Sequence, residues 1–403
     1  MKKVIRLALA VCMVASMAAC GGSTSSSSAQ APSAPASTSA AGSTQAPAAG
    51  GEVTIKVGGI GPLTGGTAVY GVAVKNGAQI AVDEINASDS AIKFEYNFQD
   101  DEGDGEKAIN AYNNLKDWDM QVLMGTVTTG PCLAVISETA TDNMFQITPS
   151  ASSTDVIVND NAFQVCFTDP NQGVSAADYI ADNGLATKIA AIYDSSDAYS
   201  TGIYNAFAEE AAAKGLEIVC AEAFTADSKS DFKTQLQKAQ SAGADLVFLP
   251  IYYTEASLII TQANQLGYDP AFFGCDGMDG ILTVENFDLE LAEGLMLMTP
   301  FNAGGTDELT SNFVKTYEAD YGETPNQFAA DAYDAIYAIK AACEKAGVTG
   351  DMDVSALGDA LKAAITEISI DGLTGSDMTW KASGEVSKAP IVVKVENGAY
   401  AQM

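Results

Sequence analysis

Two turns rich in hydroxyl side chains are the segments of this sequence with the clearest potential for chemistry. The first, Gly125–Pro131, runs from a predicted strand into a predicted helix, and the second, Thr148–Ser153, follows the next predicted strand. The free N–H groups and the positive dipole end of a helix N-terminus suit an anion such as a carboxylate. Each turn could instead only cap its helix, because Ser and Thr are common N-cap residues.

Side chains that usually bind anions are scarce. The chain has no His, and its only Arg is Arg6, so the folded part has no arginine to clamp a carboxylate. The 52 acidic residues outnumber the 20 basic ones, which gives a net charge of −32. This charge argues against a nucleic-acid-binding protein. The absence of His excludes enzymes that use a His base, a Ser–His or Cys–His pair, or His metal ligands.

Acidic pairs and glycine-rich turns give little support to an enzyme. Pairs such as Asp100–Asp101 are expected by chance among 52 acidic residues. Asp331 and Asp334 lie one turn apart on a predicted helix, 326–342, and we expect them on its solvated face. The glycines at 58–61 are not followed by the further glycine or the lysine of a phosphate-binding loop. We therefore predict no enzyme activity, no cofactor and no metal site.

The first residues are typical of an export signal. A basic start precedes an apolar stretch, Leu7–Ala19, that is shorter than the ~20 residues needed to span a bilayer. The small residues before Cys20 resemble a bacterial lipoprotein signal, in which this cysteine carries the lipid; an ordinary secretory signal is the alternative. We predict a signal peptide at 1–19 and a flexible, uncharged linker at 20–51. The protein would then be anchored to the outer face of the cytoplasmic membrane.

The cysteines that follow Cys20 are irregularly spaced, at Cys132, Cys166, Cys220, Cys275 and Cys343. No C-x-x-C pair occurs among them. Neither a zinc site nor a disulfide framework is therefore indicated, and whether any of these thiols pair stays open.

From residue 52 onward, short runs of β-forming residues alternate with helical patterns. The first series has strands at 53–60, 94–98, 121–125 and 144–147, and helices at 70–86, 108–118 and 132–140. The second has strands at 188–194, 215–224, 245–250 and 271–274, and helices at 173–183, 200–214, 231–241 and 254–267. Because strands and helices alternate, the pattern predicts an α/β fold with two doubly wound parallel-sheet lobes.

The two series repeat one loop. In each, the first strand leads through a turn to a tyrosine at the start of a helix, Tyr70 in the first series and Tyr199 in the second. In doubly wound sheets, ligands bind outside the carboxyl ends of the strands. If the lobes face each other, a ligand site between them is expected.

Longer motifs occur in a characteristic order. They include IKVGGIGPLTGGTAVYG (55–71), VLMGTVTTGPCLAVISE (122–138), ITPSASSTDV (147–156), IAAIYDSSDAYSTG (189–202) and FFGCDG (272–277). Together they resemble the branched-chain amino-acid-binding family of ABC-transporter solute-binding proteins, the leucine/isoleucine/valine-binding proteins. The similarity covers roughly residues 53 to 400, and it implies the type I periplasmic-binding fold.

The resemblance implies two lobes joined by a hinge with three chain crossings. The crossings are expected near Asp169–Pro170, near Thr299–Pro300 and around Gly372–Ser376. The expected lobes are 52–169 with 300–373 for lobe 1, and 170–299 with 374–403 for lobe 2. The resemblance also implies a monomer that delivers a neutral, branched-chain amino acid to an ABC permease.

The resemblance further assigns ligand-binding residues. The carboxylate and ammonium of the ligand would be held by Thr128, Thr129, Ser150 and Ser152. Asp276, where the family often has Glu, would pair with the ammonium, although an Asp in such a turn is commonly a turn residue. The ligand side chain would pack against Tyr70, Val127, Tyr199 and Tyr252, with Tyr253 as the alternative to Tyr252.

Other functions remain open at this stage. A ligand-sensing surface lipoprotein or a purely structural lipoprotein could use the same fold. The fold also serves aromatic amino acids, amides, ureas and short peptides. The sequence does not identify the ligand or the permease.

Overall fold

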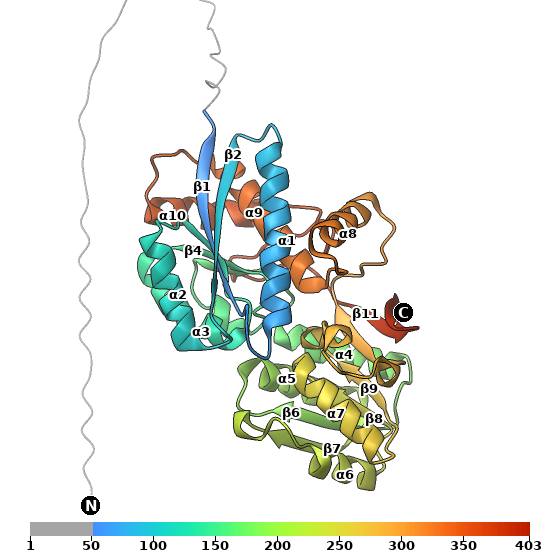
Figure 1. Ribbon diagram of the computed structural model, residues 1–403. Coiled ribbons are helices and arrows are strands. Elements are labelled where there is room, and N and C mark those ends of the chain that lie inside the picture. Colours follow the sequence, from blue (N-terminus) through green and yellow to red (C-terminus); the bar gives the residue numbers. More distant parts are fainter. Residues whose placement is uncertain (1–50) are drawn as a thin grey trace, which may run out of the picture. The chain divides into compact units, whose positions relative to one another are not determined.

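The first sheet has five parallel strands in the order β2-β1-β3-β4-β5 (Figure 1). The computed structural model describes residues 51–403. The predicted signal peptide, Cys20 and nearly all of the predicted linker lie outside these described residues. The strands are β1 (Val53–Gly61), β2 (Ile92–Asp100), β3 (Val122–Gly125), β4 (Phe145–Thr148) and β5 (Ala162–Gln164). We call the part of the chain built on this sheet lobe 1.

The second sheet repeats this order and adds a hairpin at one edge. Its order is β12-β11-β10-β9-β8-β6-β7, and we call the part of the chain built on it lobe 2. Its strands are β6 (Lys188–Asp194), β7 (Glu217–Phe224), β8 (Leu246–Leu249), β9 (Ala271–Gly274), β10 (Met296–Thr299), β11 (Ile391–Glu396) and β12 (Ala399–Gln402). The first five are parallel, whereas β11 runs antiparallel to β10 and β12. The predicted fold class is confirmed, and the hairpin is an addition that the sequence did not predict.

Helices cover both faces of each sheet. In lobe 1, α1 (Ala68–Ala87) packs on α9 (Gln327–Ala346), and α2 (Gly105–Asp117) packs on α3 (Thr129–Asp142). In lobe 2, α4 (Asp169–Asp182) packs on α5 (Ala198–Lys214), and α6 (Lys233–Ala242) packs on α7 (Tyr253–Gln265). The remaining helices are α8 (Glu308–Tyr321) and α10 (Val354–Ala364), with short 3-10 turns at 154–157, 226–228, 276–278, 281–283, 289–292 and 365–367. The layered arrangement is the one that buries a parallel sheet on both sides.

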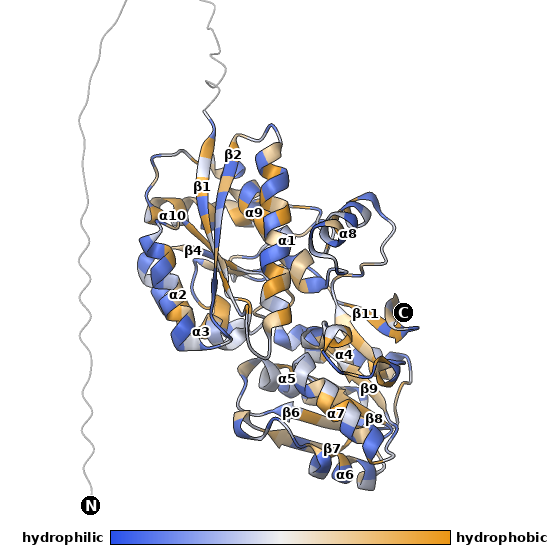
Figure 2. Cartoon of the chain, viewed as in Figure 1, coloured by the Kyte–Doolittle hydropathy of each residue, from blue (hydrophilic) through white to orange (hydrophobic). Residues whose placement is uncertain are grey.

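Helices α1 and α7 are amphipathic. Figure 2 shows hydrophobic and hydrophilic residues on different sides of α1 and α7. The buried residues of α1 recur at helical spacing, as at Val74, Ala78, Ala81 and Ile85. Within residues 51–403, none of the helices is both long and apolar enough to cross a membrane.

Two helices that reach the junction between the lobes have well-capped N-termini. The Thr168 hydroxyl accepts a hydrogen bond from the Asn171 N–H at the start of α4, and Pro170 occupies the first turn. The side chain of Asn326 accepts one from the Ala329 N–H at the start of α9. Such caps satisfy N–H groups that a helix leaves unpaired, so both helices begin at defined positions.

The two lobes contact each other directly through aromatic side chains. Tyr70, on α1, stacks on Phe328 of α9 at 4.1 Å between ring centroids and meets Tyr253 of α7 edge-on at 5.0 Å. The Tyr70 hydroxyl also donates to the carbonyl of Gly277 in lobe 2. The structure therefore describes a closed arrangement of the lobes.

The segment that follows the expected third crossing, Gly372–Ser376, still contacts lobe 1. The Trp380 indole N–H donates to the carbonyl of Gln164 at 2.8 Å, and the Gln164 N–H donates to the carbonyl of Gly384 at 2.9 Å. These bonds hold the segment against β5 of lobe 1. We therefore propose that the chain crosses into lobe 2 between Lys388 and Ile391.

Two acidic residues of α9 are buried beside this crossing. Asp331 and Asp334 are only 2% and 1% exposed, so the expectation of a solvated face was wrong. The Asp334 carboxylate accepts from the N–H groups of Leu373 and Thr374, and Lys388 Nζ lies 2.6 Å from Asp331 Oδ1. Spacing along a helix cannot show that a later segment of the chain covers the face. We call Asp331, Asp334, Thr374 and Lys388 the hinge cluster.

Candidate functional site

A small cavity lies between the lobes, where the helices that follow β1 and β6 begin. It encloses about 230 Å³ of space not filled by atoms. Its lining residues are Tyr70, Val127, Thr128, Thr129, Ser150, Tyr199, Tyr252, Asp276, Gly277 and Phe328. Eight of the nine predicted ligand-binding residues are therefore brought together, and Ser152 is the exception.

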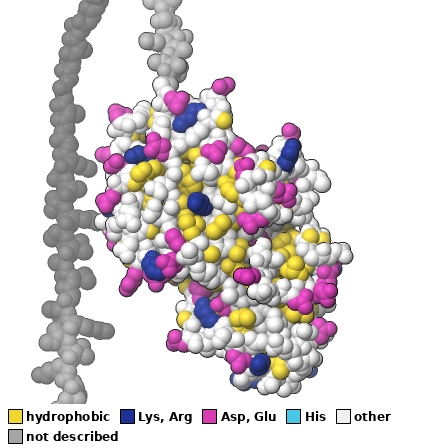
Figure 3. Space-filling model, in the orientation of Figure 1, with side chains coloured by type: hydrophobic (Ala, Val, Ile, Leu, Met, Phe, Trp, Pro, Cys, Tyr) yellow, Lys and Arg dark blue, Asp and Glu magenta, His cyan; other side chains and the backbone are white. Residues whose placement is uncertain are grey.

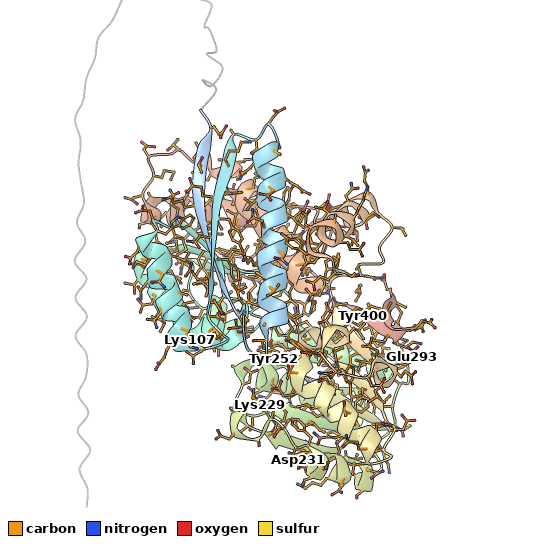
Figure 4. All side chains as sticks on the ribbon, in the orientation of Figure 1. Lys107, Lys229, Asp231, Tyr252, Glu293 and Tyr400 are labelled. Atoms are coloured by element: carbon orange, nitrogen blue, oxygen red, sulfur yellow. The ribbon has the colours of Figure 1, made fainter. Side chains whose placement is uncertain are left out.

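Tyrosine rings form the walls of this cavity. Tyr199 and Tyr252, both from lobe 2, are stacked with 4.8 Å between ring centroids and 11° between ring planes. Tyr70 of lobe 1 meets Tyr252 at 5.7 Å. Tyr252 lines the cavity, whereas Tyr253 packs on Tyr70 and is not among the lining residues, so we propose Tyr252 of the two tyrosines left open by the sequence. Figure 4 labels Tyr252 where the two lobes meet.

The turn between β3 and α3 presents hydroxyl groups that the helix does not use. Thr128 is the N-cap residue of α3, but its side chain accepts no capping hydrogen bond. The hydroxyls of Thr128 and Thr129 are buried and have no hydrogen-bond partner among residues 51–403. Capping alone therefore does not explain these two residues. Because Pro131 has no N–H, the N–H groups of Thr129 and Gly130 are the donors that the first turn offers to a ligand.

The second hydroxyl-rich turn is tied to the first. The Ser150 hydroxyl donates to the carbonyl of Val127 at 2.7 Å, which fixes the two turns against each other. Ser153, and not Ser150 or Ser152, caps the short helical turn that follows. Ser152 is fully buried, and its carbonyl accepts from the Asp169 N–H at 2.8 Å. Ser152 therefore lies beside the first crossing between the lobes and not on the wall of the cavity.

Asp276 is held rigidly on the opposite wall. It is 4% exposed, and its Oδ1 accepts a hydrogen bond from the Tyr199 hydroxyl at 2.7 Å. Its N–H donates to the side chain of Gln172 at 3.1 Å, and its carbonyl accepts from the side chain of Gln327 at 2.7 Å. These bonds come from both lobes, because Gln172 is on α4 and Gln327 is on α9. These bonds fix the position of Asp276 on the wall of the cavity.

Burial raises the pKa of Asp276 to about 7. The hydrogen bonds from Tyr199 and Gln172 act in the opposite direction, and the nearby Asp331 raises the pKa further. A buried carboxylate without a cation is costly, so a positively charged group in the cavity would favour its ionised form. The cavity thus combines an acid on one wall with hydroxyl and N–H donors on the other.

Several residues around the cavity were not found from the sequence. Gly277 and Phe328 line it, and Gln172 and Gln327 hold the backbone of Asp276. Gly277 adjoins Asp276 in the sequence and could have been included for that reason. Phe328 lies more than fifty residues further along the chain, so only the packing of α9 against α1 brings it to the site.

The stability of the ligand-free protein is expected to increase as the pH falls from 8 to 5. Burial raises the pKa to about 7 for Asp101 and Asp276, and to about 6 for Asp197, Asp279 and Asp331. Unfolded carboxyl groups lose their protons near pH 4, so between about pH 4 and 7 the folded state binds more protons. Urea unfolding at pH 5, 6, 7 and 8 measures this trend. A free energy of unfolding that rises with pH across this range would contradict it.

A small cavity closed between two doubly wound lobes, with an acid facing unpaired donors, defines a two-lobed solute-binding protein. A family model described as "Periplasmic binding protein" matches residues 54–399. The chain is 30% identical over 308 residues to "Leu/Ile/Val-binding protein homolog 3" of Brucella melitensis, covering 74% of this chain and 80% of the relative. The chain belongs to this family of periplasmic binding proteins, in its branched-chain amino-acid-binding group.

Solved structures agree with this assignment. The branched-chain amino acid transporter substrate-binding protein LivJ of Streptococcus pneumoniae, in complex with isoleucine, is 28% identical with a TM-score of 0.77. The match covers 87% of this chain and 100% of that one. An ABC-transporter solute-binding protein of R. palustris in complex with benzoate is 21% identical, with a TM-score of 0.77 over 87% and 95% of the two chains, and shares the fold. Proteins of this family bind solutes outside the cytoplasm for ABC transporters and are not enzymes.

Proposed function

We propose that this protein captures a neutral, branched-chain amino acid between its lobes and delivers it to an ABC permease. The observation that carries this proposal is that a carboxyl group and hydrogen-bond donors lie on opposite walls of one small cavity. Asp276 lies on one wall, and the unpaired hydroxyls of Thr128 and Thr129 at the start of α3 lie on the other. An α-amino acid carries both a positive ammonium and a negative carboxylate, so it matches both walls at once.

The carboxylate of the ligand would contact lobe 1. The N–H groups and the dipole at the N-terminus of α3 stabilise a negative charge, and the Thr129 hydroxyl can donate to it. The ammonium would pair with Asp276 of lobe 2, and the side chain would pack among Tyr70, Tyr199 and Tyr252. Since these groups come from both lobes, the ligand stabilises the closed form, which a permease can recognise.

An aromatic acid is the competing class of solute, because a protein with the same fold binds benzoate. Benzoate has a carboxylate but no ammonium. In this cavity it would leave the buried Asp276 without a positive partner, which costs free energy. We therefore favour a zwitterion over an aromatic anion.

We further propose that a lipid at Cys20 attaches the protein to the membrane. The residues that precede it are typical of a signal peptide, and a two-chain lipid gives stable attachment to a membrane. Removal of the predicted signal peptide takes away the basic residues at positions 2, 3 and 6. The remaining 17 lysines and 52 acidic residues give a net charge of −35. An anionic membrane repels such a body, so the lipid would hold the protein, as a monomer, at the outer face of the membrane.

A thermal-shift screen tests the class of solute. The twenty amino acids, benzoate and urea are each added to the protein, and the melting temperature is measured. A ligand that binds the folded state raises it by mass action. We expect leucine, isoleucine or valine to give the largest increase, and isothermal titration calorimetry then gives the affinity. An increase with benzoate but with no amino acid would contradict the proposal.

Replacing Thr129 with Val is expected to weaken amino-acid binding about 10- to 100-fold. The substitution keeps the shape of the side chain but removes a donor to the ligand carboxylate, and hydrogen bonds to charged groups contribute about 1.5–3 kcal/mol. Calorimetric titration with isoleucine measures the effect. Thr141→Val, an exposed position on the same helix, is the matched control and should leave the affinity unchanged. Equal affinities for Thr129→Val and the control would place the carboxylate elsewhere.

A further inference from the structure

The acid of the proposed ammonium site is held from the other lobe as well as from its own. We call the cavity that Asp276 lines the first cavity. Within lobe 2, the Asp276 N–H donates to the Gln172 side chain, and its carboxylate accepts from the Tyr199 hydroxyl. From lobe 1, the Gln327 side chain donates to the Asp276 carbonyl at 2.7 Å. Of these three bonds, only the last crosses between the lobes.

The next residue of lobe 2 is held in the same way. The Tyr70 hydroxyl of lobe 1 donates to the carbonyl of Gly277 and accepts from the Tyr253 N–H at 3.3 Å. On the lobe 2 side, the Tyr199 hydroxyl accepts from the Gly277 N–H at 2.9 Å. The fit is close, because a Cβ at Gly277 would lie 2.5 Å from that hydroxyl. Two consecutive carbonyls of lobe 2 therefore accept hydrogen bonds from two side chains of lobe 1, Tyr70 and Gln327.

Gln327 makes a second bond to lobe 2 through its backbone. It is the first residue of α9, so its N–H has no partner within the helix. This N–H donates to the Asp279 carboxylate at 2.8 Å, and a carboxylate is stabilised at the N-terminus of a helix. Gln327 and Asp279 are both buried. The side chain and the backbone of Gln327 therefore bind the same loop of lobe 2.

Tyr70 and Gln327 stand between the first cavity and a second, larger one. The second cavity encloses about 1620 Å³ of unfilled space, part of it open to solvent, and the two cavities share no lining residue. Tyr70 and Phe328 line the first cavity, whereas their neighbours Val69 and Asn326 line the second. Figure 3 shows hydrophobic side chains gathered in the region between α8 and β11. Apolar contacts have no direction, so the hydrogen bonds of Tyr70 and Gln327 define how the lobes meet here.

We propose that Tyr70 and Gln327 are positioning residues that complete the ammonium site only when the lobes close, a role that rests on the function proposed above. With the lobes apart, the carbonyls of Asp276 and Gly277 are hydrated; with the lobes closed, they accept from Gln327 and Tyr70. The closed bonds fix Asp276 on its wall and separate the first cavity from the second. The ammonium then meets its carboxylate away from water, where their attraction is stronger.

A Gln327→Met variant tests the bond to Asp276. Methionine has a similar length but no donor, and the backbone bond to Asp279 is kept. Gln327 does not line the first cavity, so its replacement removes no contact with the ligand. We expect isoleucine to bind at least fivefold more weakly and to dissociate faster, because only the closed form leaves the Asp276 carbonyl buried without a donor. Calorimetric titration and stopped-flow fluorescence measure the two effects.

A Tyr70→Phe variant tests the second bond. It keeps the ring that lines the first cavity and removes the hydroxyl, whose two hydrogen bonds both go to lobe 2. The same weakening of isoleucine binding is expected, and this variant is read alone if Gln327→Met fails to fold. Gln237→Met, an exposed position on α6, is the matched control and should bind as the unmodified protein does. Unchanged affinity in the folded variants would overturn the proposal.

Small-angle X-ray scattering without ligand separates this proposal from the amino-acid-binding function. Losing both bonds should favour open arrangements, so the double variant Tyr70→Phe/Gln327→Met should have a larger radius of gyration than Gln237→Met. If the unmodified protein does not bind isoleucine, the proposed function fails, and equal radii of gyration would then overturn the positioning role as well. If the unmodified protein and both single variants bind isoleucine equally, only the positioning role is wrong.

Discussion

An Asp276→Asn variant is expected to lose at least a hundredfold in affinity for the amino acid. The carboxylate is buried on the wall of the first cavity and is held in place by Tyr199. Asparagine has the same size but no charge, so the ligand ammonium would enter a buried site without a counter-charge. Breaking a buried charge pair by removing one partner costs about 3–5 kcal/mol, which corresponds to a factor of about 150 to 5,000.

Calorimetric titration with isoleucine, leucine and valine measures this loss. Asp231→Asn is the matched control, because Asp231 is an exposed lobe-2 acid near the start of α6, away from Tyr252 (Figure 4). The control should bind as the unmodified protein does. If Asp276→Asn binds isoleucine with unchanged affinity, Asp276 is not the partner of the ammonium and the proposed orientation of the ligand is wrong.

The Asp276→Asn variant could also lose binding because it unfolds. The melting temperature of the ligand-free variant distinguishes unfolding from the loss of a ligand contact. Burial raises the pKa of Asp276, so its ionised form destabilises the folded state at pH 8. Asparagine cannot ionise and removes this cost. Without ligand, Asp276→Asn should therefore melt at a higher temperature than the unmodified protein at pH 8, and the difference should shrink at pH 5. Such a gain in stability on substitution is typical of a residue that serves binding at the expense of stability.

The parts of this protein that the sequence predicted are those set by local patterns. Strand 188–194 and strand 271–274 were predicted at their observed bounds, because short apolar runs between turn residues indicate buried strands. The tyrosines that begin α1 and α5 were predicted to share a cleft, since both follow the first strand of a doubly wound lobe. Both sheets have the same strand order, which brings Tyr70 and Tyr199 to equivalent positions.

The parts that the sequence did not predict depend on contacts between distant segments. Phe328 reaches the first cavity only because α9 packs along α1. The later third crossing that we propose follows from the bonds of Trp380 and Gly384 to Gln164, more than two hundred residues earlier. Periodicity within one segment carries no information about such partners, so it could not show that the polar face of α9 would be covered.

Replacing Lys388 with Met is expected to destabilise the protein by about 3–5 kcal/mol. The Lys388 and Asp331 side chains are 1% and 2% exposed, and their charged atoms lie 2.6 Å apart. Lys388 Nζ also donates to the Thr374 hydroxyl at 2.7 Å, and it is the only basic residue of the hinge cluster. Methionine fills a similar volume but leaves Asp331 buried without a positive partner.

Urea unfolding at pH 7.5 without ligand measures this change. Lys394→Met is the matched control, because the side chains of the Lys394–Glu396 pair on β11 are 33% and 46% exposed, and such a solvent-accessible pair should contribute less than about 1 kcal/mol. Combining Lys388→Met with Asp331→Leu removes both charges and should recover at least half of the lost stability, since no unpaired charge remains at Asp331. A Lys388→Met variant as stable as the control would mean that water or Thr374 compensates Asp331. The hinge would then depend on packing rather than on this ion pair.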